Sequence, residues 1–197
     1  MQHSPVTQPV VAPPMASPVP SGKLGMWWFL SSEIVTFGGL ISCYLVARLL
    51  HPSWADSSQQ LNVLVATLNT IVLLVSSWTI VMAHDAVEHG DVQQAKPWLG
   101  YTILGGLLFL LIKSAEWSGK FEHGILPWSN GFWSFYFAMT GLHALHVLGG
   151  VVINVALWIA AVRGRLQPIA HRVEYAGLYW HFVDVVWIFL FPLLYLA

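Results

Sequence analysis

Charged residues are scarce in this sequence, and cysteine occurs only once. Lys, Arg, Asp and Glu make up 9% of the 197 residues and the formal net charge is -1. With no basic run either, we expect no nucleic acid among the partners. The lone Cys43 excludes an internal disulfide and a metal site built from several cysteines. Hydrophobic residues, in contrast, make up 56% of the chain and 11 residues are Trp, which predicts a polytopic membrane protein.

The first 24 residues differ in composition from the rest of the chain. They combine Val, Ser, Gln and Ala with repeated prolines and contain no continuous apolar core. This pattern predicts a flexible, Pro-rich tail rather than a cleavable signal peptide. The prolines are Pro5, Pro9, Pro13, Pro14, Pro18 and Pro20.

Residues 25–197 contain five apolar runs, each long enough for a hydrocarbon core that needs about 20 helical residues. Helix-breaking residues concentrate between the runs, in "HPSWADSSQQ", "DVQQAKP", "FEHGILPWSNG" and "RGRLQPIAHR". We therefore predict an all-α fold, a bundle of five transmembrane helices. The predicted spans are residues 26–50, 61–83, 98–117, 132–162 and 175–196.

The distribution of Lys and Arg predicts the orientation. Cytoplasmic segments carry an excess of these residues, and here one side of the membrane holds more of them than the other. We therefore expect the N-terminus in the cytoplasm and the C-terminus outside. The richer side has Lys23, Lys96, Arg163, Arg165 and Arg172, and the other side has Arg48 and Lys120.

Ionisable residues inside the spans are the candidate functional residues. Each costs at least about 2.5 kcal/mol at the membrane centre, so it should face protein or water and have a partner. In "LYWHFVDVVWIFLFPLLYL", His181 and Asp184 are three residues apart and share a helix face, so they could bond each other or a neighbour. Glu33 lies at the same predicted depth, while His143 and His146 lie near the middle of the fourth span.

Metal and haem chemistry are disfavoured by the spacing of the histidines. In "HDAVEH" the two histidines are five residues apart, about 140° around the helix, whereas a zinc-protease helix places them four apart on one face. His143 and His146 in "GLHALHVLGG" share a face, but a bis-histidine haem would need a second histidine at equal depth from another helix. We therefore favour core histidines hydrogen-bonded across helices.

Two readings of the membrane-embedded polar residues remain open at this point. Glu33, His143, His146, His181 and Asp184 could form a proton relay, or each could join packed helices by a hydrogen bond worth about 1 kcal/mol or less. Against a transporter, no pair of short, Gly/Pro-broken helices frames a substrate site. The Gly pairs at 38–39, 105–106 and 149–150 instead predict close helix packing, and the Trp and Tyr residues near span ends predict interfacial anchors.

Several segments, taken in order, resemble successive helices of cytochrome c oxidase subunit III and of the related quinol oxidase subunit. They are "SSEIVTFGGL", "LNTIVLLVSSWTIVMAHDAVEHG", "LLFLLIKSAEWSGKF", "FYFAMTGLHALHVLGG" and "HRVEYAGLYWHFVDVVWIFLF". The most specific are "GLHALHVLGG" and "YWHFVDVVWIFLF", and the resemblance covers nearly everything after residue 24.

This resemblance implies a non-catalytic, accessory subunit of a proton-pumping haem-copper terminal oxidase of aerobic respiration, in a bacterial plasma membrane. The chain itself would hold neither haem nor copper, which belong to partner subunits. It would pack against the catalytic subunit I, with subunit II in the same complex, bind phospholipid and support proton uptake by subunit I.

The resemblance also implies roles for individual residues. The family's membrane carboxylate matches Glu33, and further family carboxylates and histidines match residues that would support proton uptake or form a buried polar lattice. Arg163 and Arg165 could contact lipid phosphate, with ordinary positive-inside anchoring as the alternative. The further matches are Glu116, His143, His146, His181 and Asp184.

The chain departs from the family in three places. It lacks the first two helices of the longer members, Lys113 stands where a neutral polar residue is usual, and Asp85 stands where histidine is frequent. Lys113 could pair with Glu116, three residues away, or extend outward. Other readings are a quinol oxidase subunit III, a homologue associated with nitric oxide reductase, an independent proton-coupled transporter and a small b-type cytochrome.

Overall fold

The computed structural model describes residues 21–196 and consists of helices, without a strand in that range. Five helices are long and apolar enough to cross a membrane, which confirms the predicted all-α, five-span architecture. They are α1 (Ser21–Leu50), α3 (Val63–Glu88), α4 (Val92–Glu122), α5 (Gly131–Val162) and α6 (His171–Phe191). Shorter elements are α2 (Trp54–Ser58), the 3-10 turn η1 (Gln167–Ile169) and the π-helical turn η2 (Pro192–Leu196), which continues α6.

The helices extend beyond the predicted spans. The segment "DVQQAKP" was predicted as a loop, but most of it belongs to α4. The Asp91 side chain caps this helix, because it accepts a hydrogen bond from the Gln94 N–H at 3.0 Å. Pro97 lies inside the helix. Of the predicted tail, residues 21–24 belong to α1, and the proline-rich residues 1–20 lie outside the described residues.

Three helices end in the same way, with a glycine in the left-handed region. After α3, the Gly90 N–H bonds the Val87 carbonyl at 3.0 Å and the Asp91 N–H bonds the Ala86 carbonyl at 2.8 Å, the Schellman pattern that satisfies carbonyls left free at a helix end. The same pair of bonds follows α4 and α5. The glycines are Gly90, Gly124 and Gly164, with φ of 78°, 72° and 67°.

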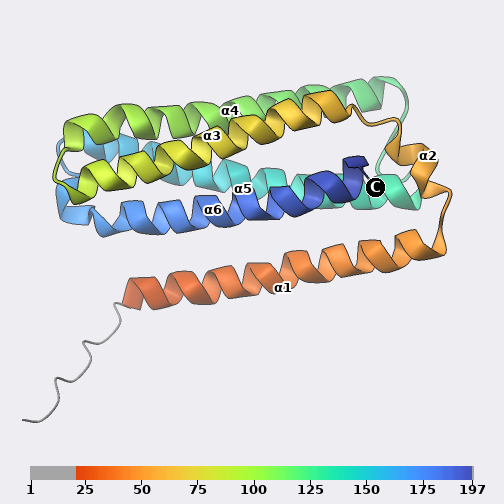
Figure 1. Cartoon of the computed structure of the whole chain (residues 1–197), viewed down its shortest axis with the longest axis horizontal. Helices are drawn as coiled ribbons and strands as arrows, with labels where there is room; N and C mark the ends of the chain where they lie inside the picture. Colours follow the sequence, from red (N-terminus) through yellow and green to blue (C-terminus); the bar gives the residue numbers. More distant parts are fainter. Residues whose placement is uncertain (1–20, 197) are drawn as a thin grey trace, which may run out of the picture.

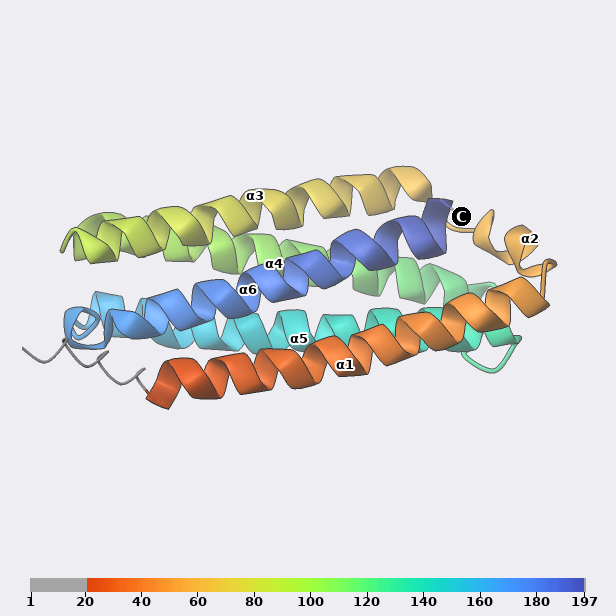
Figure 2. The same cartoon turned by 60° about the horizontal axis from the view of Figure 1, so that its bottom comes forward.

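Helices α3 to α6 form a four-helix bundle, and α1 lies along its α5–α6 side (Figures 1 and 2). The start of α1 shares one end of the molecule with the α3–α4 and α5–α6 connections. The other end holds α2, the α4–α5 connection and the C-terminus. Of the five spans, α1 is the least buried and α6 the most buried, so α1 is the peripheral helix.

Trp180 of α6 fills the centre of the bundle and is fully buried. A Cβ atom added at Gly106 of α4 or Gly150 of α5 would come within 2.6 Å of its indole ring, so glycine is needed at both positions. Gly105 likewise allows α4 to approach Ser76 of α3. The predicted role in close packing fails for Gly38 and Gly39 of α1, where a Cβ atom would meet no atom within 4 Å.

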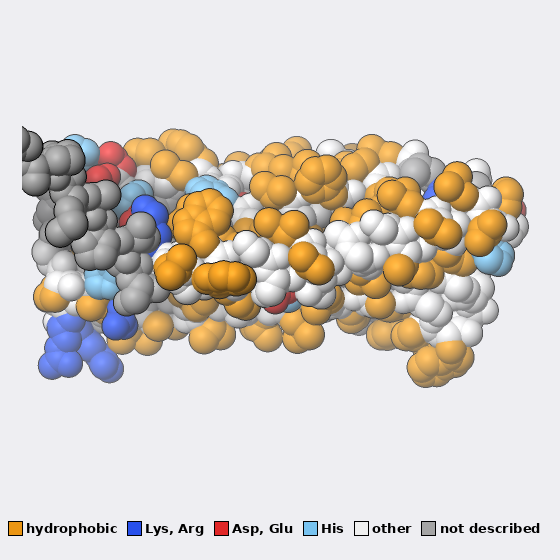
Figure 3. Space-filling model, turned by 90° about the horizontal axis from the view of Figure 1, so that it is seen from below, with side chains coloured by type: hydrophobic (Ala, Val, Ile, Leu, Met, Phe, Trp, Pro, Cys, Tyr) orange, Lys and Arg blue, Asp and Glu red, His pale blue; other side chains and the backbone are white. Residues whose placement is uncertain are grey.

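The outer surface is apolar along the length of the bundle. Figure 3 shows hydrophobic side chains over this surface, whereas most of the Lys and Arg side chains visible in that view gather at one end. On α1, Val35 and Leu49 are 75% and 82% exposed. Such a surface suits a multi-pass membrane protein, whose apolar side chains face lipid.

We predict that Gly150→Ala destabilises the protein by about 1–3 kcal/mol, because the added methyl group overpacks the core against Trp180. Thermal melting of the detergent-solubilised protein measures the effect. Gly25→Ala on α1 is the matched control, since a Cβ atom there meets no atom within 4 Å. An unchanged melting temperature for Gly150→Ala would contradict this packing.

Candidate functional site

Glu33 of α1 and His146 of α5 form a pair across the gap between the peripheral helix and the bundle. Their Oε2 and Nε2 atoms are 3.1 Å apart, and the two side chains are 18% and 14% exposed. The His146 Nδ1 atom lies 2.8 Å from the Leu142 carbonyl. Because a carbonyl only accepts, Nδ1 carries a hydrogen.

The contacts of the His146 ring limit how a hydrogen can lie between it and Glu33. With Nδ1 already a donor, Nε2 either carries a second hydrogen and donates to the Glu33 carboxylate, or accepts a hydrogen from the Glu33 carboxylic acid. In both forms the pair holds one proton more than a separate carboxylate and neutral imidazole, and its net charge is zero. Both arrangements place one shared hydrogen between the Glu33 carboxyl and the His146 ring.

Two aromatic side chains flank the His146 ring. The ring of Phe37 lies edge-on to the His146 ring at 5.2 Å, and the Tyr179 ring stacks against it at 6.5 Å. The Tyr179 hydroxyl also donates to the His146 carbonyl at 3.0 Å. Because the two side chains are mostly buried, the interaction between Glu33 and His146 is stronger than it would be in open solvent.

Two further polar contacts dock α1, one on each side of Glu33 along the helix. Lys23 forms a 2.8 Å ion pair with Glu174 of α6, and the Tyr44 hydroxyl donates to the Leu193 carbonyl at 3.3 Å. The Glu33–His146 pair is the central contact of the three. Its geometry therefore depends on how α1 sits against α5 and α6.

A second buried polar cluster lies toward the other end of the bundle and is built from Lys113, Glu116, Tyr136 and Tyr195. The Lys113 ammonium lies 3.1 Å from Glu116 and donates to both tyrosine hydroxyls. Each hydroxyl in turn donates to Glu116 at 2.8 Å. Lys113 and Glu116 are 3% and 8% exposed, so of the two predicted alternatives the inward pair is confirmed. The cluster ties α4 to α5 and to η2.

The sequence did not reveal the two tyrosines of this cluster. Tyr residues near span ends were interpreted as interfacial anchors, but Tyr136 is fully buried and Tyr195 is 4% exposed. A buried lysine three residues from a glutamate was the available signal. Two such charges need further hydrogen-bonding partners in the core, and tyrosine hydroxyls supply them.

His181 and Asp184 do not bond each other. The His181 Nδ1 atom lies 2.6 Å from the Ser77 hydroxyl of α3, so the predicted neighbour contact exists across helices. Asp184 is 4% exposed and neither of its oxygens has a hydrogen-bond partner among residues 21–196, although the Ser77 hydroxyl lies beside it. Its desolvation is not compensated by a bond within the described chain.

The prediction that the core histidines are hydrogen-bonded across helices is wrong for His143. It is fully buried, and neither ring nitrogen has a partner in the described part of the chain. The Trp187 ring stacks on it at 5.0 Å and the Phe109 ring meets it edge-on at 5.4 Å. The expectation holds for His146, which bonds Glu33 across helices.

The remaining candidates lie apart from both clusters. Arg163 and Arg165 are exposed in the turn after α5, where lipid headgroups could reach them.

Between residues 21 and 196, no three His, Cys, Asp or Glu side chains gather in a way that could hold a metal ion. The structure therefore brings together Glu33 with His146 and Glu116 with Lys113, and leaves His143, His181 and Asp184 separate.

We predict that Lys113→Met destabilises the protein by about 3–5 kcal/mol, because Glu116 would remain as a buried charge without its cation. The double variant Lys113→Met, Glu116→Gln should recover much of this loss, since both charges are then removed. Thermal melting of the two variants in the same detergent gives the comparison. A double variant no more stable than the single one would show that the ion pair is not what Lys113 contributes.

Comparison with known proteins supports one family over nearly the whole chain. The family model for cytochrome c oxidase subunit III matches residues 16–197. Cytochrome c oxidase subunit 3 of Corynebacterium diphtheriae is 37% identical over 177 residues, which cover 88% of this chain and 86% of that protein. The protein of the same name from Thermostichus vulcanus is 35% identical over 175 residues, with 88% and 86% covered. The one from Synechocystis is 36% identical over 175 residues, with 87% and 74% covered. The chain therefore belongs to the cytochrome c oxidase subunit III family.

Proposed function

We propose that this chain is the accessory subunit III of a proton-pumping haem-copper oxidase of the cytochrome c oxidase type. In this proposal it carries no haem or copper, packs against the catalytic subunit I in a complex with subunit II, and stabilises subunit I. Family membership and the names of its relatives support this function. By the positive-inside rule, its N-terminus faces the cytoplasm of a bacterial cell and its C-terminus faces outward.

The proposal that this chain supports proton uptake by subunit I rests on the Glu33–His146 pair. It lies about 10 Å into the first predicted span from the proposed cytoplasmic side. A carboxyl group and an imidazole that share one proton can pass it on and regain it, and the partly exposed side chains keep the pair accessible from the side of α1. We assign it the role of holding a proton near subunit I.

The other candidate residues have structural roles in this proposal. Glu116 holds the cluster that joins α4, α5 and η2, and His181 joins α6 to α3 through Ser77. His143 and Asp184 are the other two buried polar residues among the candidates. Arg163 and Arg165 contact lipid phosphates at the proposed cytoplasmic surface.

The test is to purify the complex through a tag on this chain in mild detergent, from cells with the native chain and from cells with Glu33→Gln. Both preparations should contain an oxidase haem spectrum in stoichiometric amount, because the glutamine amide introduced at this position can still donate to His146 and keep α1 docked. Proton uptake during turnover should be several-fold slower in the variant, because an amide cannot exchange the proton.

One control variant makes this outcome specific. Ser32→Ala, next to Glu33 on the exposed face of α1, should leave proton uptake unchanged, since its hydroxyl bonds only the Phe29 carbonyl among the described residues. Elution of the native chain alone and colourless would overturn the accessory-subunit assignment. Equal proton uptake in the native and Glu33→Gln complexes would overturn the role of the pair alone.

A further inference from the structure

Tyr179 of α6 is buried and contacts both helices that supply the Glu33–His146 pair. On α5, its ring lies nearly parallel to the His146 ring, with the ring centres 6.5 Å apart and the planes inclined by 26°. On α1, the centre of the Phe29 ring lies 6.0 Å from it. Phe29 precedes Glu33 by four residues, so the two side chains share a face of α1. One side chain from a third helix therefore joins the helices of the carboxyl and of the imidazole.

The Tyr179 hydroxyl fixes this side chain on α5. It donates to the His146 carbonyl at 3.0 Å. A Cβ atom at Gly149 would lie 3.3 Å from the hydroxyl oxygen, and one at Gly150 would lie 3.2 Å from the ring. Because both distances are shorter than ordinary van der Waals contact, the two glycines give the tyrosine room to reach the carbonyl. The bond ties α6 to α5 at the residue that carries the imidazole.

The orientation of the His146 ring decides whether it can exchange a hydrogen with Glu33. Its Nδ1 atom lies 2.8 Å from the Leu142 carbonyl, and its Nε2 atom lies 3.1 Å from Glu33 Oε2. Proton transfer needs heavy atoms about 2.6–3.2 Å apart, so a rotation of the ring that moves Nε2 away from the carboxyl stops the exchange. A side chain that limits this rotation keeps the pair in the geometry that transfer requires.

Phe37 borders the same ring, but from the helix of Glu33. It lies edge-on to His146 at 5.2 Å and meets the Phe182 ring of α6 at 6.2 Å. Because Phe37 and Glu33 belong to the same helix, Phe37 changes place together with the carboxyl. Tyr179 belongs to α6, which packs with α5 inside the four-helix bundle. Tyr179 can therefore hold the His146 ring independently of α1.

We propose that Tyr179 is a positioning residue of the Glu33–His146 pair and holds the His146 ring with Nε2 toward the Glu33 carboxyl. This inference rests on the proposed role of the pair in proton uptake. Tyr179 does not itself pass the proton, because its hydroxyl hydrogen is directed to the His146 carbonyl. It acts on the transfer through the placement of His146.

The test measures proton uptake during turnover in the complex purified through a tag on this chain. Tyr179→Leu removes the ring and the hydroxyl and should slow uptake several-fold, as Glu33→Gln does. Tyr179→Phe keeps the ring, loses one hydrogen bond and should slow uptake about twofold. Adding Tyr179→Leu to Glu33→Gln should cause no further loss, because a residue that acts through the pair has no effect once the pair cannot exchange a proton.

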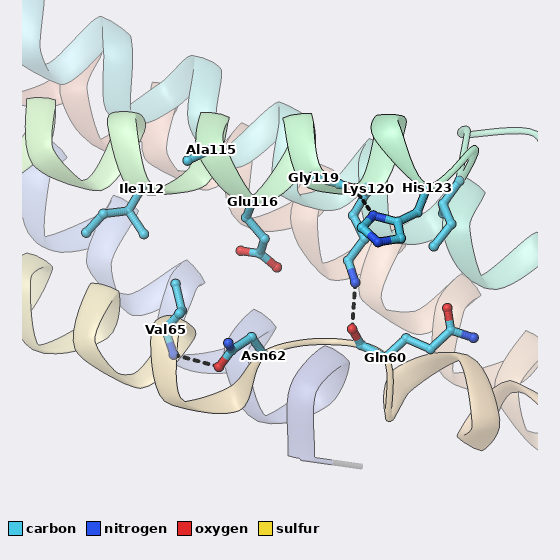
Figure 4. Close-up of a pocket in the computed structure, with 10 residues that line it drawn as sticks. Gln60, Asn62, Val65, Ile112, Ala115, Glu116, Gly119, Lys120 and His123 are labelled. Carbon is cyan, nitrogen blue, oxygen red and sulfur yellow. Dashed lines mark hydrogen bonds between the residues drawn. The ribbon is translucent and has the colours of Figure 1, made fainter.

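Tyr195→Phe is the matched control, because it also removes one buried tyrosine hydroxyl, which here donates to Glu116. Figure 4 shows the Glu116 carboxylate in a groove of about 860 Å³ between α4 and the start of α3. None of the described residues that line this groove belongs to α1. Tyr195→Phe should therefore leave proton uptake at the native rate.

Nitrogen NMR of His146 in the same complexes gives a readout that a merely structural role would not move. Tyr179→Leu and Tyr179→Phe should shift or broaden the Nε2 signal, and Tyr195→Phe should leave it unchanged.

Native uptake and a native Nε2 signal in Tyr179→Phe would overturn the inference, including when Tyr179→Leu fails to assemble. Equal slowing by Tyr179→Leu in the native and Glu33→Gln chains would overturn it as well, since Tyr179 would then act outside the pair. Native uptake in Glu33→Gln would instead overturn the proposed function, and the Nε2 signal would still decide whether Tyr179 positions the ring.

Discussion

An ionisable side chain in the membrane is costly without a partner, and the two acid–base pairs of this chain answer that constraint, whereas Asp184 and His143 have no hydrogen-bond partner among residues 21–196. Lipid supplies no hydrogen bonds, and breaking a buried ion pair by removing one partner costs about 3–5 kcal/mol. Lys113 and Glu116 satisfy each other and recruit two tyrosine hydroxyls. Glu33 and His146 satisfy each other across a helix interface. These contacts hold the helices of the fold together.

The two pairs differ in what surrounds them. The Lys113–Glu116 pair lies inside the four-helix bundle and has all its partners close by, so it acts as a rigid joint. The Glu33–His146 pair joins the bundle to α1, the least buried of the five helices. The distance between Glu33 and His146 therefore depends on how α1 is placed against α5.

The sequence predicted the features that depend on a single helix. The lengths of the apolar runs predicted five spans, and the spacing of Lys113 and Glu116 allowed the pair that forms. Features that depend on how one helix is rotated against another were missed. His181 and Asp184 share a face of α6, but Ser77 of α3 takes the bond of His181. Tyr136 and Tyr195 come from separate helices, and nothing in their local spacing predicts that they meet at Glu116.

The proposal that Glu33 and His146 share one proton can be tested on the His146 ring itself. Solid-state nitrogen NMR of the protein labelled at histidine, with the His146 signals assigned by comparison with His146→Gln, reports which ring nitrogens carry hydrogen. If the proton is shared, we expect hydrogen on Nδ1 and, in addition, an Nε2 signal typical of a nitrogen that donates a hydrogen to the Glu33 carboxyl or accepts one from it. A neutral His146 ring with hydrogen on Nε2 and none on Nδ1 would contradict it.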